Sequence, residues 1–341
     1  MKVLLTGHDG YIGAVMTRVF KDAVHEVVGL DTGFFREAAL GGDIEALETI
    51  PLDLRDVTPE DLDGIDAIAH LAALSNDPLG DLDPNLTLDI NYEASVNLAR
   101  SARESGVQRF VYSSSCSMYG ASDELVNEEA DFNPLTPYAD SKIKAEIDIR
   151  KLASDSFSPV YMRNATAYGV SERFRADIVL NNLSCWAYTT GEVKILSDGM
   201  AWRPIVHIED ISRAFLAALE APKETIHNEA FNVGFTTENY LVRDMAEIVK
   251  DTVLGCQVVY GSERNADPRS YRVDFSKMES AFPHLEETKW TAEAGAKELY
   301  ETFKRVNLTV DDFQGRHYVR LNQLKHLLEE DKLEADLRWK K

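Results

Sequence analysis

Cysteine is scarce in this sequence, whose 341 residues include only Cys116, Cys185 and Cys256. An odd number of widely spaced cysteines forms neither a disulfide framework nor a cysteine metal cluster. Disulfides persist mainly in oxidising compartments. We therefore expect reduced thiols, no bound metal and a cytoplasmic location.

Long hydrophobic runs are missing as well. The apolar run at the N-terminus breaks at Gly7 and is too short for a signal peptide, and no run approaches the about 18 residues of a membrane span. Basic residues are also few: 36 lysines and arginines face 58 aspartates and glutamates, which gives a formal net charge of −22. Nucleic acids and anionic membranes require a basic face, so we expect neither as a partner.

Short apolar runs alternate with amphipathic stretches in the first half of the chain. Residues 2–6, 26–31, 67–73 and 109–115 have the pattern of buried strands, and residues 91–106 that of a helix. Strand–helix alternation with nearly continuous apolar strands predicts an α/β fold with a doubly wound parallel sheet, the Rossmann arrangement. After about residue 165 the pattern becomes less regular, which indicates a smaller mixed α/β lobe.

A glycine-rich segment follows the first predicted strand. The sequence TGHDGYIG places Gly7, Gly10 and Gly13 between that strand and a predicted helix. Glycines let the backbone turn sharply and approach a pyrophosphate, and the helix N-terminus supplies free N–H groups. Asp31 ends the second strand about twenty residues later, where a carboxylate binds a ribose hydroxyl. The combination predicts a dinucleotide site.

Asp31 also bears on the choice of dinucleotide. A carboxylate facing a 2′-phosphate would cost roughly 1–3 kcal/mol at a moderate effective dielectric, and the residues that follow are Thr32 and Gly33 rather than arginine. We therefore predict NAD rather than NADP. Asp53 ends the next apolar run, where it can either contact the adenine edge or cap the strand end.

Three polar residues suit alcohol–ketone chemistry beside a nicotinamide. Ser115 ends the strand 109–115, at the sheet edge where open α/β sheets bind ligands, and Tyr138 and Lys142 lie one helical turn apart. Free tyrosine has a pKa near 10, and an ammonium ~4 Å away supplies ~4 kcal/mol at an effective dielectric near 20, which would bring that pKa close to 7. We predict that Tyr138 is the acid/base, that Lys142 keeps it acidic, and that Ser115 orients the substrate oxygen.

At this point the chain resembles the extended short-chain dehydrogenase/reductases that act on nucleotide sugars, the NAD-dependent epimerase/dehydratase family. The motifs that carry the resemblance run from residue 1 to about 300 and are TGHDGYIG (6–13), HLAALS (70–75), SSSCSMYG (113–120), YADSK (138–142), RNATAYG (163–169), RPIVHIEDI (203–211) and RNADPRSYRVDFSK (264–277). The resemblance implies bound NAD, a nucleoside-diphosphate-sugar substrate and a homodimer. It makes Ser115, Tyr138 and Lys142 the catalytic residues.

The resemblance also implies two sets of binding residues. The cofactor set is Gly7, Gly10, Tyr11, Ile12, Gly13, Asp31, Asp53, Leu54, Leu71, Ala72, Ala73, Asn91, Tyr138 and Lys142. The substrate set is Ser75, Ser117, Thr166, Asn182, Arg203, Arg264 and Arg269. Its arginines would offset the acidic character of the chain near the diphosphate. Thr166 departs from the asparagine that many relatives carry, which indicates an atypical substrate.

The residues after Ser115 distinguish reactions within the family. Relatives that eliminate water carry an Asp-Glu pair there, and relatives that decarboxylate carry Glu at the second position, whereas this chain has Cys116 and Ser117. Relatives that epimerise a carbon next to a ketone have a cysteine at the position of Ser117. Cys116 lies one residue earlier, so in an extended segment it points to the opposite face. With these reactions set aside, the sequence predicts a 4-epimerase, which oxidises the sugar at C4 and returns hydride to the other face.

Two alternatives stay open. A nucleotide-sugar 4-ketoreductase or dehydrogenase would use the same Ser-Tyr-Lys residues, and a non-catalytic dinucleotide-sensing protein could keep the same scaffold. For each of these functions we expect the chain to have three parts. Residues 1–164 form the NAD-binding domain with the catalytic residues, 165–307 form mainly a substrate-binding lobe with segments returning to the Rossmann sheet, and 308–341 form a helical tail.

Overall fold

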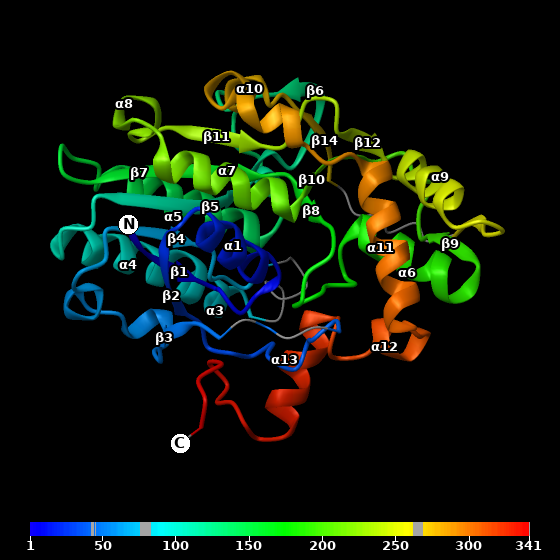
Figure 1. Cartoon of the computed structure of the whole chain (residues 1–341), viewed down its shortest axis with the longest axis horizontal. Coiled ribbons are helices and arrows are strands. Elements are labelled where there is room, and N and C mark those ends of the chain that lie inside the picture. Colours follow the sequence, from blue (N-terminus) through cyan, green and yellow to red (C-terminus); the bar gives the residue numbers. More distant parts are fainter. Residues whose placement is uncertain (42–43, 45, 76–82, 262–268, 341) are drawn as a thin grey trace.

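The main sheet consists of seven parallel strands, seen in a computed structural model that describes residues 1–41, 44, 46–75, 83–261 and 269–340. The strand order is β11-β7-β5-β4-β1-β2-β3 (Figure 1). The bounds are β1 (Lys2–Thr6), β2 (Glu26–Leu30), β3 (Glu48–Ile50), β4 (Ala67–His70), β5 (Arg109–Ser115), β7 (Ser158–Asn164) and β11 (Ala230–Val233). This order confirms the predicted doubly wound α/β fold.

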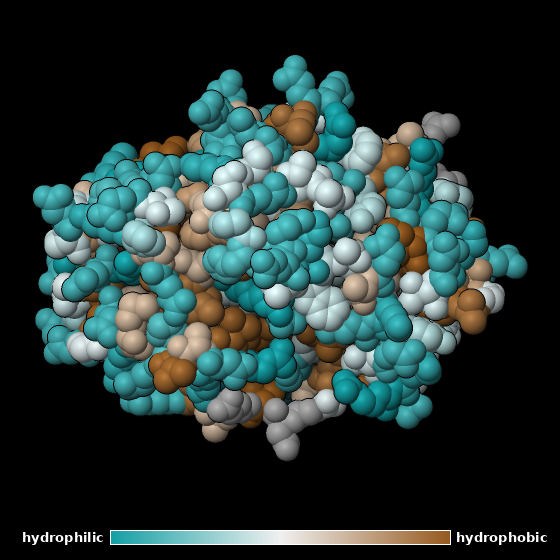
Figure 2. Space-filling view, turned by 45° about the horizontal axis from the view of Figure 1, so that its top comes forward, coloured by the Kyte–Doolittle hydropathy of each residue, from teal (hydrophilic) through white to brown (hydrophobic). Residues whose placement is uncertain are grey.

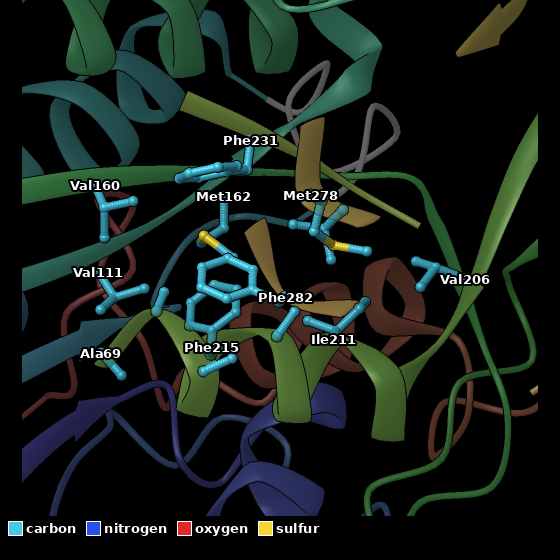
Figure 3. Close-up of a cluster of buried hydrophobic side chains, with 14 of the residues drawn as sticks. Ala69, Val111, Val160, Met162, Val206, Ile211, Phe215, Phe231, Met278 and Phe282 are labelled. Atoms are coloured by element: carbon cyan, nitrogen blue, oxygen red, sulfur yellow. The ribbon is translucent and has the colours of Figure 1, made fainter. Parts of the chain in front are cut away.

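Helices cover both faces of the sheet because successive strand side chains point to opposite sides. Val3 and Leu5 join the apolar cluster under α1 (Tyr11–Asp22) and α7 (Ile208–Glu220), whereas Leu4 joins the cluster on the other face. Figure 3 shows part of the first cluster, in which side chains of β5 and β7 meet those of α7. The second face is covered by α3 (Pro84–Leu88), η3 (Asp89–Glu93), α4 (Ala94–Glu104) and α5 (Pro137–Arg150).

The second half of the chain adds three small sheets beside the main one. β10 pairs with β8 and β12, β9 pairs with β13, and β6 pairs with β14. Their bounds are β6 (Ala121–Val126), β8 (Thr166–Tyr168), β9 (Glu192–Ile195), β10 (Trp202–His207), β12 (Asn239–Leu241), β13 (Gln257–Tyr260) and β14 (Ser270–Val273). The division at residues 164 and 307 stays a prediction.

The remaining helices pack partly against the small sheets and partly against the main sheet and its helices, and the last of them belong to the C-terminal tail. They are α6 (Val179–Thr190), α8 (Lys223–Ile226), α9 (Val242–Thr252), α10 (Ser276–Ala281), α11 (Ala292–Val306), α12 (Val310–Gln314) and α13 (Arg320–Glu329), with short turns η1 (Leu54–Asp56), η2 (Pro59–Leu62), η4 (Cys116–Tyr119) and η5 (Pro283–Thr288). In Figure 1 the tail lies at the bottom of the molecule, on the side of β3.

The connections place a ligand-binding edge next to β1. β1 pairs with β2 on one side and β4 on the other, and the helices that follow these strands leave toward opposite faces. In open α/β sheets such a switch point opens a crevice at the carboxyl ends of the strands. The face shown in Figure 2 is mostly hydrophilic, with hydrophobic residues in scattered patches. Within the described residues, no helix combines the length and apolar character needed to span a bilayer.

Candidate active site

A cavity of about 490 Å³ opens at the carboxyl ends of β1, β2, β4 and β5. It brings together residues that are far apart in the sequence, from the glycine loop to the C-terminal helix. The predicted site residues on its wall are Gly7, Gly10, Tyr11, Ile12, Gly13, Asp31, Asp53, Leu54, Leu71, Ala72, Ala73, Ser75, Ser115, Ser117, Tyr138, Lys142, Thr166, Arg203 and Arg269.

The glycine loop provides a tight backbone cradle at the start of α1. Gly7 has φ +75, which favours glycine, and a Cβ added there would lie 2.9 Å from the backbone nitrogen of Ala72. A Cβ at Gly13 would lie 2.0 Å from the Gly7 carbonyl oxygen. Glycine at both positions therefore lets the loop pack closely against neighbouring backbone while it lines the cavity, and the free N–H groups of the first turn of α1 attract an anion. The loop fits the pyrophosphate of a dinucleotide.

Acidic residues follow the next two strands on the same cavity wall. The carboxylate of Asp31 accepts hydrogen bonds from the backbone of Gly33 at 2.7 Å and of Asp9 at 3.2 Å. Burial raises the pKa of Asp31, and these two N–H donors oppose that effect. Asp53 accepts from the backbone and the guanidinium of Arg55, so it caps η1 while also lining the cavity. This arrangement fits the ribose and adenine end of NAD.

The three predicted catalytic residues line the opposite part of the cavity. Ser115 ends β5 and caps η4, and its hydroxyl donates to the Ser117 hydroxyl at 2.9 Å. Thr136 caps α5 by accepting from the backbone of Ala139 at 3.2 Å, which places Tyr138 in the first turn. Lys142 lies one turn further, with its Nζ 5.9 Å from the centroid of the Tyr138 ring.

Burial determines the state of Lys142. The side chain is 3% exposed, and its Nζ donates to the Ser113 carbonyl at 2.8 Å. Burial lowers the pKa of Lys142 to about 7. A phenolate formed at Tyr138 during the reaction would favour the charged ammonium of Lys142.

We expect this pair to control the pH dependence of turnover. Below pH 7 both groups hold their protons, and no base is available for a substrate hydroxyl, so the rate should fall about tenfold for each pH unit. Above pH 7 the rate should level off. A pH–rate profile measures this, with Lys144→Met as control, because Lys144 is an exposed lysine on the same helix that pairs with Asp140. A flat profile between about pH 5.5 and 8 would contradict the pairing.

Two of the predicted binding residues that the structure describes, Asn91 and Asn182, do not line the cavity. Asn91 is completely buried. Its side chain accepts a hydrogen bond from the backbone N–H of Leu74 and donates one to the Leu74 carbonyl. It therefore holds the loop after β4 in place, and its predicted contact with the cofactor stays a prediction. Asn182 donates to the Ala176 carbonyl at 2.9 Å, which orders the entry to α6. Arg264 lies outside the described residues.

The structure adds cavity residues that the sequence did not identify. Arg175 binds Asp177 through two hydrogen bonds of 2.8 and 3.2 Å, and its Nη1 donates to Ser75 at 3.2 Å. Arg320 reaches the cavity from α13. The first pair stands in an Arg-Ala-Asp run soon after the RNATAYG motif, which was a usable signal. Arg320 stands in the tail, for which the sequence predicted only helical structure.

The fold and the cavity together define an enzyme of the extended short-chain dehydrogenase/reductase type. The sequence matches the profile of the NAD dependent epimerase/dehydratase family over residues 3–234. That match covers more than half of the chain, which therefore belongs to this family. The predicted family, fold, enzyme class and NAD cofactor are confirmed.

Individual relatives agree with this assignment. A UDP-glucose 4-epimerase of Lactobacillus helveticus is 28% identical over 303 residues, covering 81% of this chain and 89% of that protein. The structure of MoeE5 in complex with UDP-glucuronic acid and NAD has a TM-score of 0.76 at 27% identity, and the match covers 89% of this chain and 99% of that one. TunA, an NAD-dependent NDP-hexosamine 5,6-dehydratase, has a TM-score of 0.79 at 23% identity over 89% of this chain and 98% of that one, which shows a shared fold alone.

Proposed function

We propose that this chain is an NAD-dependent nucleoside-diphosphate-sugar 4-epimerase. The observation that carries the proposal is the single cavity in which Ser115, Tyr138 and Lys142 face a dinucleotide cradle without a further acid or base next to Ser115. Relatives named as 4-epimerases support it, including the Lactobacillus helveticus protein, which is matched over most of its length. Because that relative acts on UDP-glucose by name, we propose uridine as the nucleotide.

The chain's own residues account for proton transfer at C4. Ser115 accepts or donates a hydrogen bond at the C4 oxygen, and Tyr138 takes the hydroxyl proton as a phenolate stabilised by the Lys142 ammonium. NAD, when bound, supplies the hydride acceptor and then the donor. After the 4-keto sugar rotates, Tyr138 returns the proton to the oxygen while hydride is added to the opposite face. Because hydride leaves C4 and later returns to it, neither the sugar nor NAD undergoes a net change of oxidation state.

The surroundings of Ser115 do not support elimination or decarboxylation. The Cys116 thiol lies against the Arg163 carbonyl at 3.0 Å, and burial raises its pKa far above neutrality. The next residue, Ser117, is held by Ser115 and has no acidic proton to give. Within the described part of the cavity wall the carboxylates are Asp31, Asp53 and Asp177. The first two follow β2 and β3, and the third is paired with Arg175.

The substrate contacts are proposed on the wall that the second half of the chain provides. Thr166, Arg203 and Arg269 line the cavity, together with Ser75 from the loop after β4. Arg203 donates to the carbonyls of Trp202, at 2.8 Å, and of Arg269. These contacts tie β10 to the segment before β14, so that both arginines stand beside the space left for a sugar diphosphate.

Incubation with a panel of nucleotide sugars tests the proposed reaction. We expect NMR to show C4 inversion of at least one UDP-sugar without added cofactor, and absorbance at 340 nm to show no net NADH. A 4-ketoreductase would instead consume NADH in proportion to product. Retained dinucleotide with no conversion of any sugar would favour the dinucleotide-sensing alternative and contradict the epimerase.

We also propose a homodimer in the cytoplasm. The exposed side chain of Ile147 on α5 lies in a shallow pocket with Leu88 and Tyr92, an apolar feature that a second copy could cover. The three cysteines are free and buried, as expected for a reducing compartment. Light scattering should give twice the chain mass of 38.2 kDa. A monomer at micromolar concentration would contradict the dimer, and cell fractionation tests the location.

A further inference from the structure

Arg320 is a buried arginine that the C-terminal helix α13 places on the wall of the active-site cavity. The residue is 2% exposed. Its Nη2 donates to the Arg173 carbonyl at 2.7 Å, and its guanidinium lies 4.4 Å from the centroid of the Phe35 ring. Nη1 is buried and has no hydrogen-bond partner among the described residues. A buried N–H group without a partner is costly, so this atom requires an explanation.

The carboxylates near Arg320 do not satisfy its free N–H group. Burial and the nearby Arg175 and Arg173 lower the pKa of Arg320 to about 9, and Asp177 and Asp31 offset this only in part. Asp177 is paired with Arg175, and Asp31 accepts its hydrogen bonds from backbone N–H groups. Neither carboxylate therefore supplies the acceptor that Nη1 lacks among the described residues. An anion in the cavity would supply that acceptor and would favour the charged guanidinium.

The position of Arg320 indicates which anion. Arg173, whose carbonyl holds the guanidinium, donates from its own Nε to Asp9 in the glycine loop at 2.7 Å. Arg320 is thus tied to the loop that opens the N-terminus of α1, and both line the same cavity. We propose that Arg320 binds the diphosphate of the dinucleotide, opposite the backbone N–H groups of the α1 N-terminus.

This assignment makes the C-terminal tail part of the cofactor site. Gln323 donates to the Phe34 carbonyl at 3.1 Å, and Trp339 donates to the Thr32 carbonyl at 2.7 Å. Leu324 and Leu327 pack with Phe34 in one apolar cluster. These contacts attach the tail to the segment directly after Asp31. Arg320 itself lies well beyond residue 234, where the match to the family profile ends.

Binding measurements on Arg320→Gln test the proposal. After retained dinucleotide has been removed from both proteins, titration calorimetry should show NADH and ADP binding about 10- to 100-fold more weakly than to the unchanged protein, because a charged hydrogen bond is lost. Adenosine, which lacks the diphosphate, should bind within about twofold of the original affinity. Lys325→Gln removes the same charge from an exposed position of α13 and should change none of these affinities.

Thermal unfolding separates a binding role from a structural one. Without ligand, Arg320→Gln should unfold at about the same temperature, because removal of a buried charge offsets the loss of its contacts with the Arg173 carbonyl and the Phe35 ring. The stabilisation that NADH gives should shrink. A lower melting temperature without ligand, or an equal loss of affinity for adenosine, would overturn the proposal. So would a titration in which Arg320→Gln loses affinity for UDP but not for NADH or ADP. These readouts measure binding only, so they hold whether the reaction is epimerisation or reduction.

Discussion

Tyr138→Phe should lower turnover about a thousandfold, the loss expected when an enzyme's general acid/base is removed. The substitution deletes one oxygen and leaves the ring in the first turn of α5, so the fold and the cofactor site should be preserved. Lys142, the predicted source of the tyrosine's acidity, would lose the group it stabilises. We expect single-turnover formation of NADH from a bound UDP-sugar to fall by the same factor.

Cofactor binding is the control for this prediction. NADH affinity of Tyr138→Phe should stay within about threefold of the original protein, because phosphate and ribose contacts provide most of the binding. Tyr300→Phe, a tyrosine on α11 outside the cavity wall, should leave turnover unchanged. If Tyr138→Phe keeps more than a tenth of the activity, the assigned role is wrong.

Glu146→Gln should lower the free energy of unfolding by about 3 kcal/mol, the cost of leaving a buried charge without its partner. Glu146 on α5 and Arg163 on β7 are 1% and 3% exposed, with 2.6 Å between Oε1 and Nη2. The other carboxylate oxygen accepts from Arg163 Nε at 3.2 Å and from Ser114 at 3.1 Å. Loss of the carboxylate charge would leave the Arg163 guanidinium buried and only partly satisfied.

This ion pair also holds the catalytic helix against the sheet. It connects α5, which carries Tyr138 and Lys142, to the strands that end at the cavity. Urea unfolding measures the effect, and Glu229→Gln is the matched control, because the exposed pair of Glu229 with Lys277 should contribute less than 1 kcal/mol. A loss below about 1 kcal/mol in Glu146→Gln would show that the buried pair adds little net stability.

Local sequence patterns were enough to predict the features that depend on neighbouring residues. The spacing of Gly7, Gly10 and Gly13 predicts a turn into a helix because only small residues permit that backbone path. The four-residue spacing of Tyr138 and Lys142 places both on one side of a helix. Asp31 follows a strand end directly. In each case the structure brings these residues to one cavity, while their roles stay predictions.

Residues whose role depends on distant segments were harder to place. Asn91 was predicted to contact the cofactor, yet its amide turns to the backbone of Leu74, a loop seventeen residues earlier in the chain. Asn182 likewise serves the Ala176 carbonyl. Side chains of this type satisfy whichever backbone group folds next to them. A one-dimensional pattern cannot state which group that is.

By itself the sequence determined the alternation of strands and helices, the glycine loop, and the catalytic spacing, because these follow from steric and periodic rules within a few residues. Only the tertiary structure decided that the tail returns across the molecule and presents Arg320 to the same cavity as Gly10. The cavity thus brings together residues about three hundred positions apart in the sequence. This arrangement depends on how leucines of α13 pack against Phe34, and packing partners are chosen only when the whole chain folds.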